Sequence, residues 1–126
     1  MSTRLRSTRQ QPVSQVGGDA AATRIAAVQM ASGPRVEANL KEAARLIEIA
    51  VKQGARLVAL PEYFGIMGMQ DTDKVAVREE YGNGPIQDFL ATTARKHGIW
   101  IVGGSVPLVA SVSSKVLNTS LVYDDQ

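Results

Sequence analysis

Short apolar runs alternate along the chain with longer stretches in which apolar residues recur at helical spacing. The runs at residues 25–28, 57–60 and 99–102 are nearly continuous, as expected for strands buried on both faces of a sheet. Between the first two runs the spacing predicts an amphipathic helix that ends at Gly54. Its apolar positions are Leu40, Ala43, Ala44, Ile47, Ala50 and Val51. A strand, a crossover helix and a second strand in this order form a right-handed parallel unit.

A second helix and one further strand complete the predicted elements. The helix spans about residues 85–97, because proline suits its first turn and Gly98 suits its end. Residues 65–73 are irregular, and residues 116–123 form a strand that follows the third apolar run without a helix between them. The alternation predicts an α/β fold built on a mainly parallel sheet, with no internal repeat and no second domain.

The first 22 residues differ in composition from the rest of the chain. They are rich in Ser, Thr, Gln, Arg and Gly and lack hydrophobic periodicity, which predicts a disordered tail before a folded portion at 23–126. Such an Arg-rich, acid-poor start also resembles a mitochondrial presequence, but Pro12 weakens an amphipathic helix there. We therefore expect a cytoplasmic protein, with mitochondrial targeting as the less favoured alternative.

Charge and hydropathy argue against two classes of partner. The formal net charge of +2 arises in the tail, because residues 23–126 hold eleven basic and eleven acidic side chains. These charges are interspersed, whereas nucleic-acid binding needs Lys and Arg clustered on one face. The apolar runs are far shorter than the roughly 20 residues of a membrane-spanning helix. We expect neither nucleic acid nor a membrane as a partner.

Several kinds of catalytic or cofactor site are excluded by residue type. The chain has no cysteine, so it holds no disulfide framework, thiolate metal site or cysteine nucleophile. The single histidine, His97, lies in the last turn of a predicted helix, where a cation suits the helix dipole. Gly82-Asn83-Gly84 lacks the third glycine of a dinucleotide loop, and Ser105 lacks the flanking glycines of a nucleophile elbow. We expect no metal and no cofactor, and we interpret Ser105 as structural.

The candidate catalytic segment is Leu-Pro-Glu-Tyr-Phe at residues 60–64. Glu62 comes directly after an apolar strand and is followed by Tyr63 and Phe64. Ligands of open α/β sheets bind outside the carboxyl ends of the strands, so a carboxylate walled by aromatic rings there suits general base chemistry. On position alone, the alternative is a strand-end glutamate that caps a helix or pairs with a surface lysine.

Four segments together resemble the opening half of carbon-nitrogen hydrolases of the nitrilase superfamily. They are residues 25–30, 54–64, 99–105 and 118–120, and the resemblance extends over residues 24–126. Within that superfamily the chain is most similar to the amidase branch that contains omega-amidase and deaminated-glutathione amidase. The resemblance implies a four-layer α-β-β-α sandwich, of which this chain forms half.

The resemblance also implies a Glu-Lys-Cys triad, in which Glu62 is the general base and the cysteine forms an acyl intermediate from a small amide. The family lysine and cysteine lie beyond Gln126, and Lys115 does not match the lysine position. We therefore expect the chain to be inactive alone. The implied partners are a small-molecule amide, the missing C-terminal half and further copies of the protein in a homo-oligomer.

Four other residues receive roles from the same resemblance. Tyr63 and Phe64 would line the substrate pocket, while Asn118 and Thr119 would support the structure near the site. Leu117 stands where the family commonly has an aromatic residue. Two other classes of function stay open: a non-catalytic binding or regulatory module, and a nucleotide-binding α/β domain, which the lack of a phosphate loop disfavours.

Overall fold

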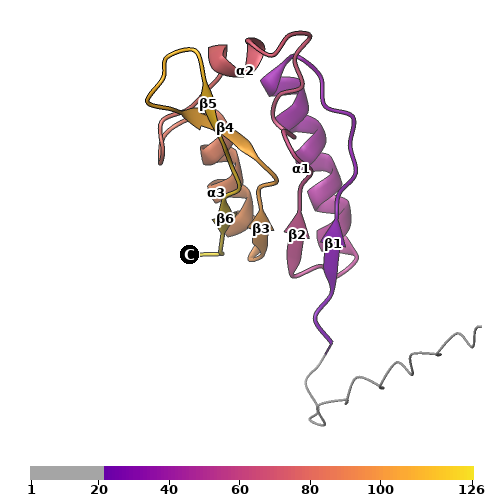
Figure 1. Ribbon diagram of the computed structural model, residues 1–126. Helices are drawn as coiled ribbons and strands as arrows, with labels where there is room; N and C mark the ends of the chain where they lie inside the picture. Colours follow the sequence, from indigo (N-terminus) through magenta and orange to yellow (C-terminus); the bar gives the residue numbers. More distant parts are fainter. Residues whose placement is uncertain (1–21) are drawn as a thin grey trace, which may run out of the picture.

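A four-stranded sheet with two helices packed on one face organises residues 22–126, the part of the chain that the computed structural model describes (Figure 1). The sheet order is β1 (Ile25–Ala27), β2 (Leu57–Ala59), β3 (Trp100–Val102) and β6 (Val122–Tyr123). The first three strands are parallel and β6 is antiparallel to β3. A separate hairpin pairs β4 (Val106–Val109) with β5 (Val116–Thr119). The predicted tail lies outside the described residues, apart from Ala22.

Of the helices within residues 22–126, α1 (Val36–Lys52) and α3 (Pro85–His97) were predicted by the sequence pattern. α1 is the crossover between β1 and β2, and α3 leads into β3. α3 has proline at its start and ends at Gly98, whose φ of 60° is in the left-handed region that favours glycine. His97 is the last residue of α3, as the sequence predicted. None of the helices among residues 22–126 is long and apolar enough to cross a membrane.

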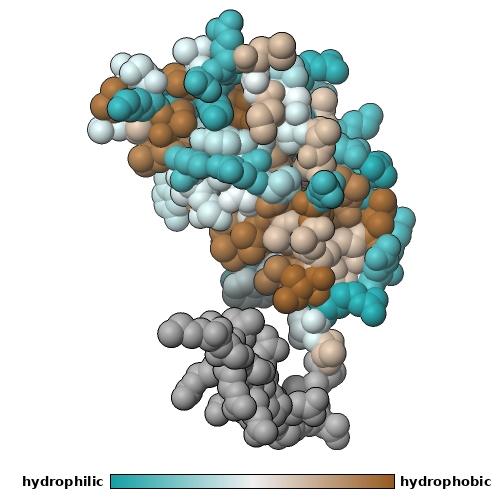
Figure 2. Space-filling view, turned by 45° about the vertical axis from the view of Figure 1, so that its right-hand side comes forward, coloured by the Kyte–Doolittle hydropathy of each residue, from teal (hydrophilic) through white to brown (hydrophobic). Residues whose placement is uncertain are grey.

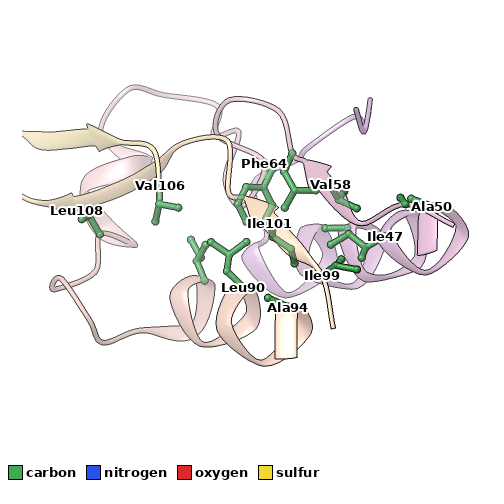
Figure 3. Packing of buried hydrophobic residues seen from close by; sticks show 14 residues of the cluster. Ile47, Ala50, Val58, Phe64, Leu90, Ala94, Ile99, Ile101, Val106 and Leu108 are labelled. Carbon is green, nitrogen blue, oxygen red and sulfur yellow. The ribbon is translucent and has the colours of Figure 1, made fainter. Parts of the chain in front are cut away.

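The core fills the space between the helices and one face of the sheet (Figure 3). The strand register aligns Val58 of β2 with Ile101 of β3 on this face. Ile47 of α1 and Leu90 of α3 pack against them, and all four side chains are fully buried. Burying a side chain of this size stabilises the fold by roughly 1.5–3 kcal/mol, so this layer holds the strands in place.

The opposite face of the sheet is partly open to solvent. Ile25, Leu57 and Trp100 are aligned on it by the register, and Ile25 and Trp100 are 65% and 50% exposed. Figure 2 shows apolar side chains gathered over the lower part of the molecule, near the start of the described chain. Among the described residues no helix packs on this face, so the structure is one helix layer on one sheet layer.

The single strand predicted over residues 116–123 was wrong. The chain forms β5 in the hairpin, breaks at residues 120–121 and then forms β6 in the main sheet. The Leu121 carbonyl accepts a hydrogen bond of 2.7 Å from the Gly103 N–H within this break. The segment before this break pairs with β4 and the segment after it pairs with β3. The hydropathy pattern of the sequence cannot show such a change of partner.

Two short elements were missed. β4 has four residues and follows β3 after only three others, while α2 (Asp73–Ala76) has a single turn. Asp73 Oδ2 accepts hydrogen bonds from the Met69 and Gln70 N–H groups at 2.8 and 3.0 Å. This contact fixes the chain before α2, so the turn is stabilised by a side-chain bond rather than by periodic apolar spacing.

A buried carboxylate joins the hairpin to α3. Glu79 is only 5% exposed and accepts hydrogen bonds from the Ile86 N–H at 2.7 Å and from the Gln87 N–H at 3.1 Å. Its backbone also bonds to the Pro107 carbonyl and the Val109 N–H of β4. Unpaired N–H groups at a helix start need acceptors, and an anion there is stabilised by the helix dipole. Glu79 therefore ties the first turn of α3 to β4.

Replacing Glu79 by alanine is expected to lower the free energy of unfolding by about 2–4 kcal/mol, because buried N–H groups lose their acceptor. Glu80→Ala removes an exposed carboxylate next to it and should change stability by less than about 0.5 kcal/mol. Urea unfolding of both variants checks the difference. Equal losses would show that the Glu79 carboxylate does not anchor the first turn of α3.

Candidate active site

The chain makes an abrupt turn where it leaves β2. The Leu60 N–H still pairs with the Val102 carbonyl at 2.9 Å, so the strand ladder extends to that residue. Tyr63, three residues later, has φ of 48° and is the one non-glycine with positive φ among residues 22–126. This conformation costs a residue with a side chain roughly 1–2 kcal/mol. Between these two points, Glu62 is presented to solvent at the carboxyl end of the strand.

A hydrogen bond from the next strand's end holds the strained residue. The Tyr63 N–H donates to Ser105 Oγ at 2.9 Å, and Ser105 is 8% exposed. Ser105 follows β3 just as Tyr63 follows β2, so the bond connects neighbouring strand ends. This contact agrees with the interpretation of Ser105 as structural, because its hydroxyl holds the residue that follows the candidate base.

Gly104 makes the approach of the two strand ends possible. Its φ is 57°, and a Cβ at this position would lie 1.9 Å from the Pro61 carbonyl oxygen and 2.8 Å from that of Leu60. Real Cβ atoms do not come this close to backbone oxygens, so only glycine fits. The role of Gly104 was not foreseen from the sequence, although glycine at a strand often marks a close approach of another backbone.

The hairpin supplies a polar partner for the carboxylate. Asn118 Nδ2 donates to Glu62 Oε1 at 3.1 Å, across 56 positions of the sequence. Asn118 is on β5, opposite Pro107 of β4. The Thr119 hydroxyl donates instead to the Leu117 carbonyl at 3.3 Å. The structure thus brings Glu62 and Asn118 together, whereas the Thr119 hydroxyl bonds within its own strand.

The two aromatic residues after Glu62 point to different environments. Phe64 is fully buried in the core, with its ring centroid 6.3 Å from that of Phe89. Tyr63 is half-buried, and Lys74 Nζ lies 4.1 Å from the centre of its ring. Because the positive φ of Tyr63 turns the chain inward, Phe64 does not stand beside the carboxylate. Of the two rings, only that of Tyr63 is available to contact a ligand in this chain.

A buried asparagine connects the loops that follow β1 and β2. Asn39 of α1 is 4% exposed and donates to the Gly33 and Gly65 carbonyls at 2.8 and 2.9 Å. The Ser32 hydroxyl donates to the Phe64 carbonyl at 2.8 Å. The segment carrying Glu62 is therefore fixed from the β1 side as well as from the β3 side.

The arrangement suits proton transfer but does not enclose a ligand. One oxygen of Glu62 is held by Asn118, and no hydrogen bond to Oε2 is found within residues 22–126. Hollows of about 230, 370 and 500 Å³ on the described surface are lined by residues other than Glu62. Across the same residues, no three His, Cys, Asp or Glu side chains come together to hold a metal ion.

Comparison with known proteins decides the family. Residues 24–126 match the carbon-nitrogen hydrolase family. The chain belongs to this family. It is 40% identical over 96 residues to a deaminated glutathione amidase of Synechocystis sp. (strain PCC 6803 / GT-S), covering 75% of this chain and 35% of that protein. It is 34% identical over 100 residues to omega-amidase NIT2-B of Xenopus laevis, covering 79% and 35%.

Solved structures of this family share the fold. Saccharomyces cerevisiae Nit3, a member of branch 10 of the nitrilase superfamily, superposes with a TM-score of 0.64 at 31% identity, covering 75% of this chain and 36% of Nit3. The C. elegans NitFhit protein gives 0.63 at 30% identity, covering 80% and 24%. The predicted superfamily and fold class are confirmed. The chain spans about a third of the length of these amidase relatives.

Gly104→Ala is expected to destabilise the chain by about 2–5 kcal/mol, because the new Cβ adds a clash with the Pro61 carbonyl to the cost of positive φ. Gly98→Ala is the matched control, since its φ of 60° is nearly the same and nothing lies within 4 Å of its Cβ. That variant should lose only about 1–2 kcal/mol. Chemical denaturation of both variants checks this, and equal losses would refute the close approach at Gly104.

Proposed function

We propose that this chain is the general-base portion of a longer hydrolase that cleaves the carbon-nitrogen bond of a small amide, as an omega-amidase does. The observation that carries the proposal is the exposed carboxylate of Glu62, held by Asn118 at the carboxyl end of β2. Membership of the carbon-nitrogen hydrolase family supports it, as do relatives named deaminated glutathione amidase and omega-amidase.

In the proposed reaction Glu62 works with a lysine and a cysteine from the remainder of the protein. Glu62 takes the thiol proton, and the thiolate attacks the amide carbon to form a tetrahedral anion that the lysine stabilises. As the carbon-nitrogen bond breaks, Glu62 returns the proton to the nitrogen and ammonia leaves. Glu62 then takes a proton from water, whose oxygen attacks the acyl-cysteine, and the acid and the free thiol are released.

Asn118 has a positioning role in this scheme. Its amide N–H holds Oε1, so the second carboxylate oxygen is left to exchange protons with the thiol, the leaving nitrogen and water. Tyr63 is proposed to line the substrate pocket that the complete enzyme forms around Glu62. Phe64 contributes by packing, because its buried ring anchors the segment that carries Glu62. Thr119 supports the site indirectly, because it belongs to β5, the strand that carries Asn118.

The remainder of the protein is proposed to complete both the chemistry and the fold. The chain has no cysteine, so the acyl-enzyme route does not run in it alone. The apolar sheet face with exposed Ile25 and Trp100 is proposed to be covered by the remainder of the hydrolase, since the matched part of the chain spans only about a third of the relatives' length. In the chain alone, where this face is uncovered, apolar surface of this kind favours association of copies.

In the complete hydrolase, Glu62→Gln is expected to lower the turnover number for glutaramate by at least ~10² to 10⁴, the usual worth of a general base. The amide keeps the size of the side chain but cannot accept the thiol proton. The melting temperature should change little, because Glu62 is exposed. Ammonia release and thermal unfolding are measured together on the same preparations.

Glu37→Gln, which changes an exposed glutamate of α1, is the matched control and should leave turnover unchanged. The 126-residue chain alone serves as the blank and should release no ammonia. A stable Glu62→Gln protein with turnover near that of the unmodified enzyme would rule out the catalytic role and favour a non-catalytic module.

A further inference from the structure

A lysine is held over the aromatic ring next to the candidate base. Lys74 of α2 places its ammonium 4.1 Å from the centre of the Tyr63 ring, and Tyr63 directly follows Glu62 in the chain. Both side chains are half-buried. The attraction of a cation for a ring face contributes about 0.5–1 kcal/mol at an exposed site and more when desolvated. Figure 1 shows α2 at the top of the molecule, between α1 and the β4–β5 hairpin.

The charge of Lys74 is not neutralised within the described residues. The ion pairs found in residues 22–126 are Arg45 with Glu42 and Lys52 with Glu48. The acid next to Lys74 in sequence, Asp73, uses its Oδ2 to accept the two N–H groups that precede α2. An ammonium group without a carboxylate partner is available to bind an anion.

Tyr63 is a rigid support for this cation. Its backbone is held at positive φ by the bond to Ser105, and the next residue, Phe64, is fixed in the core. Backbone strain of this kind persists where the surroundings enforce it and is concentrated at functional sites. The structure therefore holds Tyr63, the residue directly after Glu62, in a strained conformation at a cost in stability, and Lys74 lies over its ring.

We propose that Lys74 binds the free carboxylate of the substrate, which makes it a specificity-determining residue for monoamides of dicarboxylic acids. This rests on the proposed function. Glu62 is itself an anion and repels a substrate carboxylate brought close to it. A cation placed to one side, across the Tyr63 ring, attracts the acid end and directs the neutral amide end toward the base. A charge placed in this way contributes more to specificity, the difference in affinity between ligands with and without a carboxylate, than to binding affinity in general.

Lys74→Met in the complete hydrolase tests the assignment, because methionine keeps an unbranched apolar stem and removes the charge. The value of kcat/KM for glutaramate should fall about 10- to 100-fold, mainly through KM, as expected for loss of one charge-assisted hydrogen bond. For butyramide, which has no carboxylate, it should change less than about threefold. Glutarate, used as a competitive inhibitor, should bind more weakly by the same factor as glutaramate.

Two matched variants separate charge from structure. Lys74→Arg keeps a cation that stacks on an aromatic ring and should retain most of the preference for glutaramate. Lys41→Met removes an exposed lysine of α1 and should change neither substrate. Melting temperatures of all variants are compared, so that a loss of folding is not mistaken for a loss of binding.

If Lys74→Met leaves the ratio of kcat/KM for glutaramate to kcat/KM for butyramide unchanged, the assignment is overturned, whether or not both values fall. If the preference for glutaramate is unaffected while Glu62→Gln still abolishes turnover, the assignment of Lys74 fails and the proposed hydrolase stands. If Glu62→Gln leaves turnover unchanged, the proposed function itself fails and the assignment falls with it.

Discussion

The close approach of Gly104 to the Pro61 carbonyl is the constraint on which the rest of the site depends. Any side chain at Gly104 would occupy the space of the Pro61 backbone, so the ends of β2 and β3 meet only because the position is glycine. This contact brings Ser105 to the Tyr63 N–H. It also fixes where β4 begins. β4 pairs with β5, the strand that contains Asn118. The position of Glu62 thus follows from a backbone contact.

The same arrangement explains why the carboxylate is accessible in this chain. The helices α1 and α3 pack on one face of the sheet. The hydrogen bonds around Glu62 are made by residues at the strand ends and in the hairpin. The other sheet face and the space around Glu62 have no cover among the described residues. In the proposed hydrolase the nucleophile comes from another part of the protein, and such an opening would let the base and the nucleophile reach one substrate atom.

Much of the framework could be predicted from the sequence, because it depends on local periodicity. The helices α1 and α3 and the strands β1, β2 and β3 follow from apolar spacing and from glycine and proline at the ends. The position of Glu62 after a strand also followed from the sequence. The division of the last predicted strand into β5 and β6 could not be foreseen, since it depends on which neighbour each half pairs with.

The environment of Glu62 was less predictable for the same reason. The bond from Asn118 joins residues 56 positions apart, and no local pattern encodes it. Phe64 was expected beside the carboxylate, but the direction of its ring depends on the positive φ of Tyr63, which in turn needs Ser105 and Gly104. Lys74 belongs to a single helical turn fixed by Asp73, and its contact with Tyr63 is visible only once the chain is folded.

Asn118 is proposed to act on the reaction through the carboxylate of Glu62, and a double-mutant cycle on these two residues in the complete hydrolase separates this role from a purely structural one. We expect Asn118→Ala to reduce kcat/KM for glutaramate when Glu62 is present and to have little further effect on the Glu62→Gln background. The coupling should then be about 1 kcal/mol or more, as for residues in direct contact. Losses that simply add, with no coupling, would contradict it.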